Sequence, residues 1–217
     1  MSLKSAFRLL ASFSLACSLF VSCVGMDADI EIRDNGSGTI KLGYRISRLV
    51  ESMGKLDGNE RWLPLPVGRA DMERTVARVK GLSLTSFSSK QDENDVSIQS
   101  ELEFTNLQAL GAFLDASGRT ASLNQANGKS SLTMRLAEGG GQLDPELKRL
   151  VDEVFKGYLV GIRVRTPSNP TSTGAGTATA PSIGTASINA AARTASYSAS
   201  IAELLSSTLP VVWTITW

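Results

Sequence analysis

Two stretches of strict alternation between apolar and charged residues constrain the fold of this 217-residue chain more than any other feature. Residues 27–33 alternate mainly acidic and apolar side chains, and residues 40–46 alternate apolar side chains with basic or small ones. Between them, Asp34-Asn-Gly-Ser-Gly38 is rich in residues that tolerate a positive φ angle. Alternation with a period of two places apolar side chains on one face of a strand and polar ones on the other. The pattern predicts a hairpin with one buried face and one charged face, on which acidic side chains oppose basic ones.

Similar signals recur as far as residue 164. Asn127-Gly128 is the favoured two-residue hairpin turn, and Thr105-x-x-Gln108 has the spacing of a helix capping box. Alternation predicts further strands over 82–88, 96–104, 120–126, 129–137 and 158–164, and helical spacing predicts helices over 69–80, 105–114 and from 144. We therefore predict an α+β fold, an antiparallel sheet of repeated strand–strand–helix units with the helices packed on one face.

The last fifty residues change character twice. Residues 166–192 consist mainly of Thr, Ser, Ala, Gly and Pro, and this composition predicts a flexible loop. Val211, Trp213, Ile215 and Trp217 then alternate with other residues up to the last position. We expect this segment to be a strand that pairs within the sheet and covers the core. The predicted organisation is a domain over 23–165, the loop over 166–192, and strands over 193–217 that complete the same domain.

The first 23 residues have the order of a secretory signal peptide. Lys4 and Arg8 precede an apolar run over 9–21, and small Ser22 and Cys23 follow it. The run is shorter than the roughly 20 apolar residues of a membrane-spanning helix. Phe20-Val-Ser-Cys23 resembles a bacterial lipobox, in which the cysteine receives lipid, including palmitate, and becomes the first residue of the mature protein. The alternatives are an ordinary cleaved signal and a poorer lipobox at Cys17.

This resemblance implies a signal peptide over 1–22, lipidation at Cys23 and attachment to the inner or outer membrane of the bacterial cell envelope. The globular part would then be periplasmic or surface-exposed. The segment also resembles those of spirochaete lipoproteins. The strand after Cys23, the Asp34-to-Thr39 hairpin and the passage from Asp92 to Leu114 resemble a family of bacterial lipoproteins typified by a mycobacterial lipid-binding member. No functional residue is carried over from either group.

Composition excludes several classes of function. The chain has no histidine, which excludes Ser–His and Cys–His nucleophile systems and zinc sites of the usual His types. Its 22 basic and 21 acidic residues leave it nearly neutral, so we expect no nucleic-acid partner. Both cysteines lie at or before position 23, so the mature domain has no internal disulfide. We expect no catalytic residue, no metal and no cofactor.

Three segments are candidate binding sites. Asp27, Asp29 and Glu31 share one strand face and have the oxygen ligands that a hard cation prefers, but pairing with Lys41 and Arg45 is the simpler interpretation. Gly139-Gly-Gly141 precedes a helix but lacks the Lys-Ser/Thr of a nucleotide-binding loop. Trp62, Leu63 and Leu65 form an apolar cluster among prolines, which indicates either a recognition surface for a partner or a plug at the edge of the core.

These observations lead to one function hypothesis and two alternatives. The leading hypothesis is a membrane-anchored, non-enzymatic lipoprotein that binds a protein or lipid partner at the cell envelope. The first alternative is an outer-membrane β-barrel or pore component, because the chain ends in Trp217 after an alternating segment. The second is a hydrolase that works without histidine, through carboxylates or Lys. A structure with an apolar cavity or groove would favour a ligand.

Overall fold

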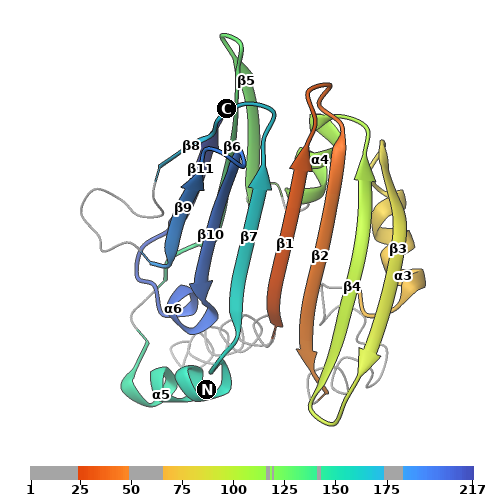
Figure 1. Ribbon diagram of the computed structural model, residues 1–217. Coiled ribbons are helices and arrows are strands. Elements are labelled where there is room, and N and C mark those ends of the chain that lie inside the picture. The colour runs from red at the N-terminus through yellow and green to blue at the C-terminus, as the bar shows by residue number, and fades with distance from the viewer. Residues whose placement is uncertain (1–23, 49–65, 116–117, 119, 141–142, 174–182) are drawn as a thin grey trace, which may run out of the picture.

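The computed structural model describes residues 24–48, 66–115, 118, 120–140, 143–173 and 183–217 (Figure 1). They form an α+β fold with two sheets, in the strand orders β3-β4-β2-β1-β7-β10-β9 and β5-β6-β11-β8. The strands of the first sheet are β1 Val24–Ile32, β2 Gly38–Ser47, β3 Leu82–Gln91, β4 Asp95–Phe104, β7 Leu159–Arg165, β9 Thr185–Asn189 and β10 Thr194–Ser200. Those of the second are β5 Ala121–Ala126, β6 Lys129–Ala137, β8 Thr171–Thr173 and β11 Val211–Thr216.

The predicted first hairpin is confirmed. β1 and β2 pair antiparallel with Ile30 opposite Ile40, so that their apolar residues share the buried face. The turn uses glycine twice. Gly36 has a φ of 78°, and a Cβ on Gly38 would lie 1.8 Å from the backbone oxygen of Glu31. Only glycine permits that close approach of the two strands.

The prediction of one antiparallel sheet is wrong in two respects. The seven-stranded sheet is mixed, because β1 pairs in parallel with β7. The hairpin of β5 and β6 belongs to the second sheet, where β6 pairs with β11. The physical reason is that alternation reports which face of a strand is buried. It carries no information on the direction or identity of a partner that is distant in sequence.

The helices lie in two groups, α3 Arg69–Ala77 with α4 Leu107–Leu114, and α5 Pro145–Val154 with α6 Ile201–Leu205. Buried residues of α3 and α4, among them Met72 and Leu110, belong to the main core. A separate small cluster lies at the end of the sheet where β7 begins (Figure 1) and consists of Val151, Phe155, Ile201 and Ala202. Leu204 of α6 belongs to the main core instead. The element order runs strand–strand–helix three times, but the third strand pair lies in the other sheet, and a structural repeat stays a prediction.

The main core lies between the two sheets, and the terminal strand covers it as predicted, but this strand pairs in the four-stranded sheet and not in the sheet of the first hairpin. β11 pairs antiparallel with β6 and β8. Its residues Val211, Trp213 and Ile215 are buried, and Trp217 is partly buried against the core. The rings of Trp213 and Tyr197, which come from different sheets, have centroids 5.6 Å apart. The large apolar side chains of β11 therefore join the two sheets.

Two further predictions need correction. The segment 166–192, predicted as a loop, contains β8 and β9, because its Thr and Ile residues suit strands and Ala186 packs against the core. Residues 174–182 lie outside the described part. The cap of α4 is Asn106 rather than Thr105, since the Asn106 side chain accepts a hydrogen bond from the backbone N–H of Ala109 at 2.9 Å.

Candidate functional site

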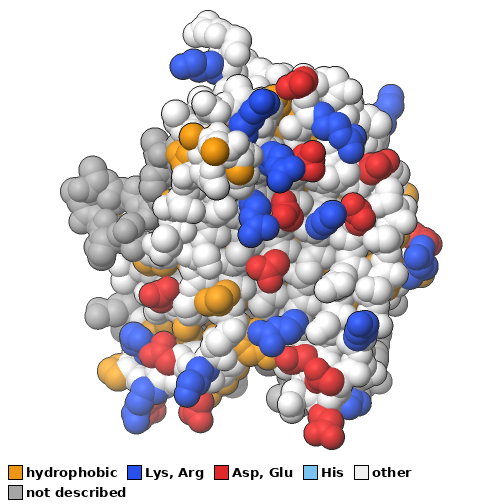
Figure 2. Space-filling model, viewed as in Figure 1, with side chains coloured by type: hydrophobic (Ala, Val, Ile, Leu, Met, Phe, Trp, Pro, Cys, Tyr) orange, Lys and Arg blue, Asp and Glu red, His pale blue; other side chains and the backbone are white. Residues whose placement is uncertain are grey.

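The open face of the seven-stranded sheet holds a shallow groove of about 800 Å³. This face is turned away from the main core and toward the viewer in Figure 2, which shows charged side chains gathered over its middle strands. All seven strands contribute residues to the groove. The groove therefore crosses the strands, and its chemistry is set by which residues come into register across the sheet.

Two neighbouring rows of residues in register line the groove. The row that we call the glycine row crosses β4, β2, β1, β7 and β10 in that order, as Gln99, Gly43, Asp27, Gly161 and Ser198. The row that we call the charged row crosses the same five strands as Glu101, Lys41, Asp29, Arg163 and Ser196. On the outer strands β3 and β9 both rows end in Ser or Thr.

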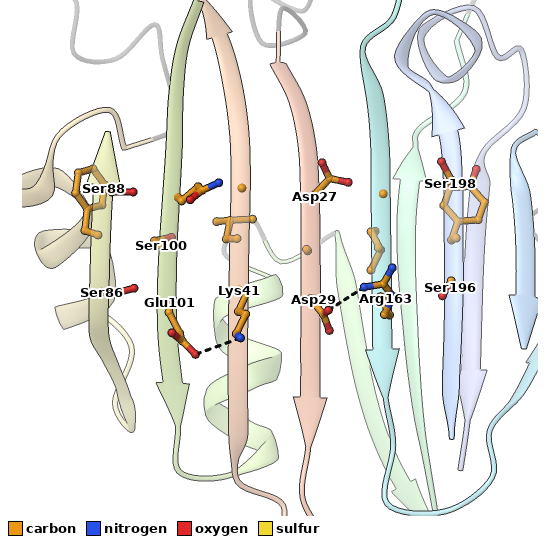
Figure 3. Close-up of a pocket in the computed structure, with 18 of the residues that line it drawn as sticks. Asp27, Asp29, Lys41, Ser86, Ser88, Ser100, Glu101, Arg163, Ser196 and Ser198 are labelled. Carbon is orange, nitrogen blue, oxygen red and sulfur yellow. Dashed lines mark hydrogen bonds and ion pairs between the residues drawn. The ribbon is translucent and has the colours of Figure 1, made fainter. Parts of the chain in front are cut away.

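The charged row is internally paired. The Lys41 ammonium lies 3.9 Å from Glu101, and the Arg163 guanidinium donates to Asp29 at 3.0 Å (Figure 3). These pairs are exposed, and each contributes at most about 1 kcal/mol to stability. They nevertheless satisfy the charges on both sides of β1, so this row offers little unbalanced charge to a ligand.

The predicted ion pairs of the first strand need correction. The ion-pair partners of β1 lie on β7 rather than on β2: Asp29 pairs with Arg163, and Glu31 pairs with Arg165 at 3.9 Å. Arg45 pairs with Asp95 at 3.8 Å. The pairing of acidic with basic side chains was expected, but its partners depend on the parallel neighbour that the sequence does not reveal. Within the described ranges, no three His, Cys, Asp or Glu residues converge as a metal site would require.

Asp27 differs from the other charged groups of the groove. Among the described residues, no basic side chain lies within 4.0 Å of its carboxylate. Its side chain is directed toward β7 (Figure 3), where a Cβ on Gly161 would lie 2.4 Å from Asp27 Oδ1. On the other side, a Cβ on Gly43 would have only the backbone oxygen of Asp27 nearby, at 4.0 Å. Glycine at 161 thus makes room for the exposed carboxylate of Asp27.

Small hydroxyl side chains line the same row of the groove, two or three strands away from this carboxylate. Ser88 and Thr185 stand at the outer strands and Ser198 next to Gly161. Tyr197 is a structural member of the same region, because it is buried and its hydroxyl donates to the backbone oxygen of Ile183 at 2.8 Å. Burial, with a smaller contribution from Glu203, raises the pKa of Tyr197 to about 12. The arrangement suits hydrogen bonding to a polar ligand.

The structure places the other sequence candidates as follows. Cys23, Trp62, Leu63 and Leu65 lie outside the described residues. Gly139 has a packing reason for being glycine, since its φ is 72° and a Cβ there would lie 2.5 Å from the backbone before β11. The groove was not predicted from the sequence. Its available signal was a glycine in the middle of each of two strand patterns, which often marks a close approach of backbone or ligand.

Comparisons with known proteins give two distant likenesses. No family model and no curated protein matches the sequence. The folded domain of LppM from Mycobacterium tuberculosis, solved by NMR, superposes with a TM-score of 0.45 and 12% identity over 90% of this chain and 89% of that one. A two-domain M1 zinc metallopeptidase, crystallised as an E323A mutant with L-arginine, gives a TM-score of 0.24 and 12% identity over 89% of this chain and 42% of that one. Neither value reaches 0.5.

Proposed function

We propose that this chain is a non-enzymatic lipoprotein of the bacterial cell envelope, anchored through Cys23, that binds a partner protein in the groove of the seven-stranded sheet. The signal-peptide pattern of residues 1–22 and the lipobox-like Phe20-to-Cys23 segment support the anchor. Among the described residues, no helix has both the length and the apolar composition for crossing a bilayer. Lipid attached at Cys23 would supply the membrane attachment.

The observation that carries the proposed binding function is the carboxylate of Asp27 in the middle of the groove, which has no basic partner among the described residues. A partner with a Lys or Arg side chain would neutralise it and form a charge-assisted hydrogen bond. The neighbouring Asp29–Arg163 and Lys41–Glu101 pairs would stay intact, so binding would not have to break them.

The lining of the groove favours a protein partner over a lipid chain. An acyl chain gains its binding energy from apolar surroundings, whereas the two rows in register that line the groove consist of glycine, hydroxyl, amide and charged residues. Exposed serines and a carboxylate would have to lose water without a hydrogen-bond partner if hydrocarbon covered them. A polypeptide supplies donors and acceptors of its own and avoids that cost.

Photo-crosslinking in the cells that make the protein tests this function. A photoreactive amino acid replaces Gln99, which is exposed in the glycine row, and in a control replaces Asn124, which is exposed on β5 of the other sheet. We expect a discrete protein adduct from position 99 that is absent from position 124 and lost when Asp27 is changed to Lys. Equal adducts from both positions, or an adduct unaffected by Asp27→Lys, would refute the groove as the binding site.

A further inference from the structure

One end of the molecule carries a group of exposed large hydrophobic side chains. Leu150 and Val154 on α5 and Leu159 at the start of β7 are 53%, 43% and 52% exposed. They are three of the five large hydrophobic side chains that are strongly exposed in the part of the chain that the structure describes. Figure 2 shows hydrophobic side chains over this end, below the charged middle of the sheet.

The exposure on α5 arises because its apolar stripe is wider than the core that it covers. Val151 of α5 and Phe155, which directly follows the helix, are buried and pack against Ile201 and Ala202 of α6. Leu150 and Val154 are four residues apart and lie beside the buried pair on the helix surface. A helix at the surface of a globular protein normally turns such a stripe toward the core, so this one is left with an uncovered apolar edge.

The first residues of β1 lie at the same end. Because β1 and β7 are parallel, with Met26 opposite Val160, both strands begin there (Figure 1). A Cβ on Gly25 would lie 3.4 Å from Cδ1 of Tyr158. Tyr158 in turn packs against the cluster of buried residues on α5 and α6. The beginning of β1 is therefore separated from α5 by a single side chain.

We propose that the surface formed by Leu150, Val154 and Leu159 lies on the lipid bilayer that holds the acyl chains of Cys23. The inference rests on the proposed lipid anchor. Cys23 is bonded directly to Val24, the first residue of β1, and consecutive Cα atoms are only about 3.8 Å apart. No spacer separates the anchor from the domain, so the acyl chains hold this end against the headgroups, where exposed apolar side chains insert.

The contact is hydrophobic rather than electrostatic. Charges on α5 are of both signs, and Lys148 donates to Asp152 at 2.7 Å within the helix. Arg149 is offset by the acidic neighbours Glu146 and Glu153 on the same helix. A surface of this composition has little attraction for anionic lipid, so we expect the contact to persist at high salt and on vesicles of phosphatidylcholine alone.

A fluorescence experiment on the lipidated mature protein tests this proposal. Removal of the signal eliminates Cys17 and lipid occupies Cys23, so an introduced cysteine is the sole free thiol. The test variant is Leu150→Cys and the matched control is Ile188→Cys, which is 43% exposed. Ile188 pairs with Ala195, which pairs in turn with Val164 of β7. Val164 lies five residues after Leu159, so Ile188 is about 17 Å farther along the strands, toward the other end of the sheet.

Both variants are labelled with a polarity-sensitive dye and reconstituted into phosphatidylcholine vesicles. We expect the label at 150 to be quenched at least about threefold more by spin-labelled acyl chains than the label at 188, and less by aqueous iodide. Flotation with the vesicles reads the anchor separately. If the protein floats and iodide quenches both labels equally, the contact surface is refuted but the anchor is supported. Protein that does not float refutes the anchor and the contact with it.

Discussion

Replacing Trp213 with Ala should remove a large part of the stability of the domain. Trp213 is fully buried between the sheets and lies 5.6 Å from the ring of Tyr197. Truncating a buried Trp to Ala costs about 3–5 kcal/mol, out of a total stability of about 5–15 kcal/mol. For a domain of this size each kcal/mol corresponds to about 2–4 °C in melting temperature, so the midpoint should fall by roughly 6–20 °C.

The assay is thermal and urea unfolding of the mature protein followed by circular dichroism, because the substitution removes one of only three Trp residues and perturbs the fluorescence signal. Trp217→Ala is the matched control, since Trp217 directly follows the same strand and is only partly buried. The free energy of unfolding lost in Trp217→Ala should be clearly smaller than that lost in Trp213→Ala. A loss below about 1 kcal/mol for Trp213→Ala would refute the role of β11 in joining the sheets.

Two further predictions concern the backbone and pH. Gly139→Ala should be strongly destabilising, because the φ of Gly139 is 72° and a Cβ would lie 2.5 Å from neighbouring backbone. A Cβ on Gly140 would have no atom within 4 Å, so the control Gly140→Ala should have a melting temperature close to that of the parent. Equal melting temperatures of the two variants would refute the packing argument. Burial raises the pKa of Tyr44 and Tyr197 above 10.0, that of Tyr197 to about 12. Because the folded-state pKa lies above the unfolded value, these tyrosines contribute their full stabilisation below pH 10, and this contribution is lost as the pH rises toward 12. The urea midpoint of unfolding should therefore be constant up to about pH 10 and fall beyond it. Midpoints that stay constant to pH 12 would contradict this.

Local features of the fold could be predicted from the sequence because neighbouring residues determine them. The turn at Asn127-Gly128 has φ angles of 52° and 73°, which suit the two-residue turn that this dipeptide favours. The side chain of Asp144 caps α5 through two backbone N–H groups, as its place before Pro145 indicates. One short helix, α6, was missed although its capping box of Ser200 and Glu203 is visible in the sequence.

The partners of the strands could not be predicted, and this is why the groove was missed. Asp27 is next to Gly161 only because β1 pairs in parallel with β7, and neither strand pattern encodes that choice. Because of the same strand pairing, Asp29 forms an ion pair with Arg163, whereas Asp27 has no basic partner among the described residues. Single residues of the site were therefore recognisable as strand residues with a polar face, but their assembly into a site depends on contacts that are distant in sequence.

The affinity for the cross-linked partner tests the central claim most directly. Asp27→Asn keeps the shape of the side chain and removes its charge, and Glu31→Gln makes the same change on the same face of β1, outside the groove. A hydrogen bond to a charged group contributes about 1.5–3 kcal/mol, so Asp27→Asn should weaken the affinity for the purified partner about 10- to 150-fold in a binding titration. Glu31→Gln should change the affinity by less than about twofold. Equal affinities of the Asp27→Asn variant and the parent would contradict the claim that this carboxylate is the centre of the binding site.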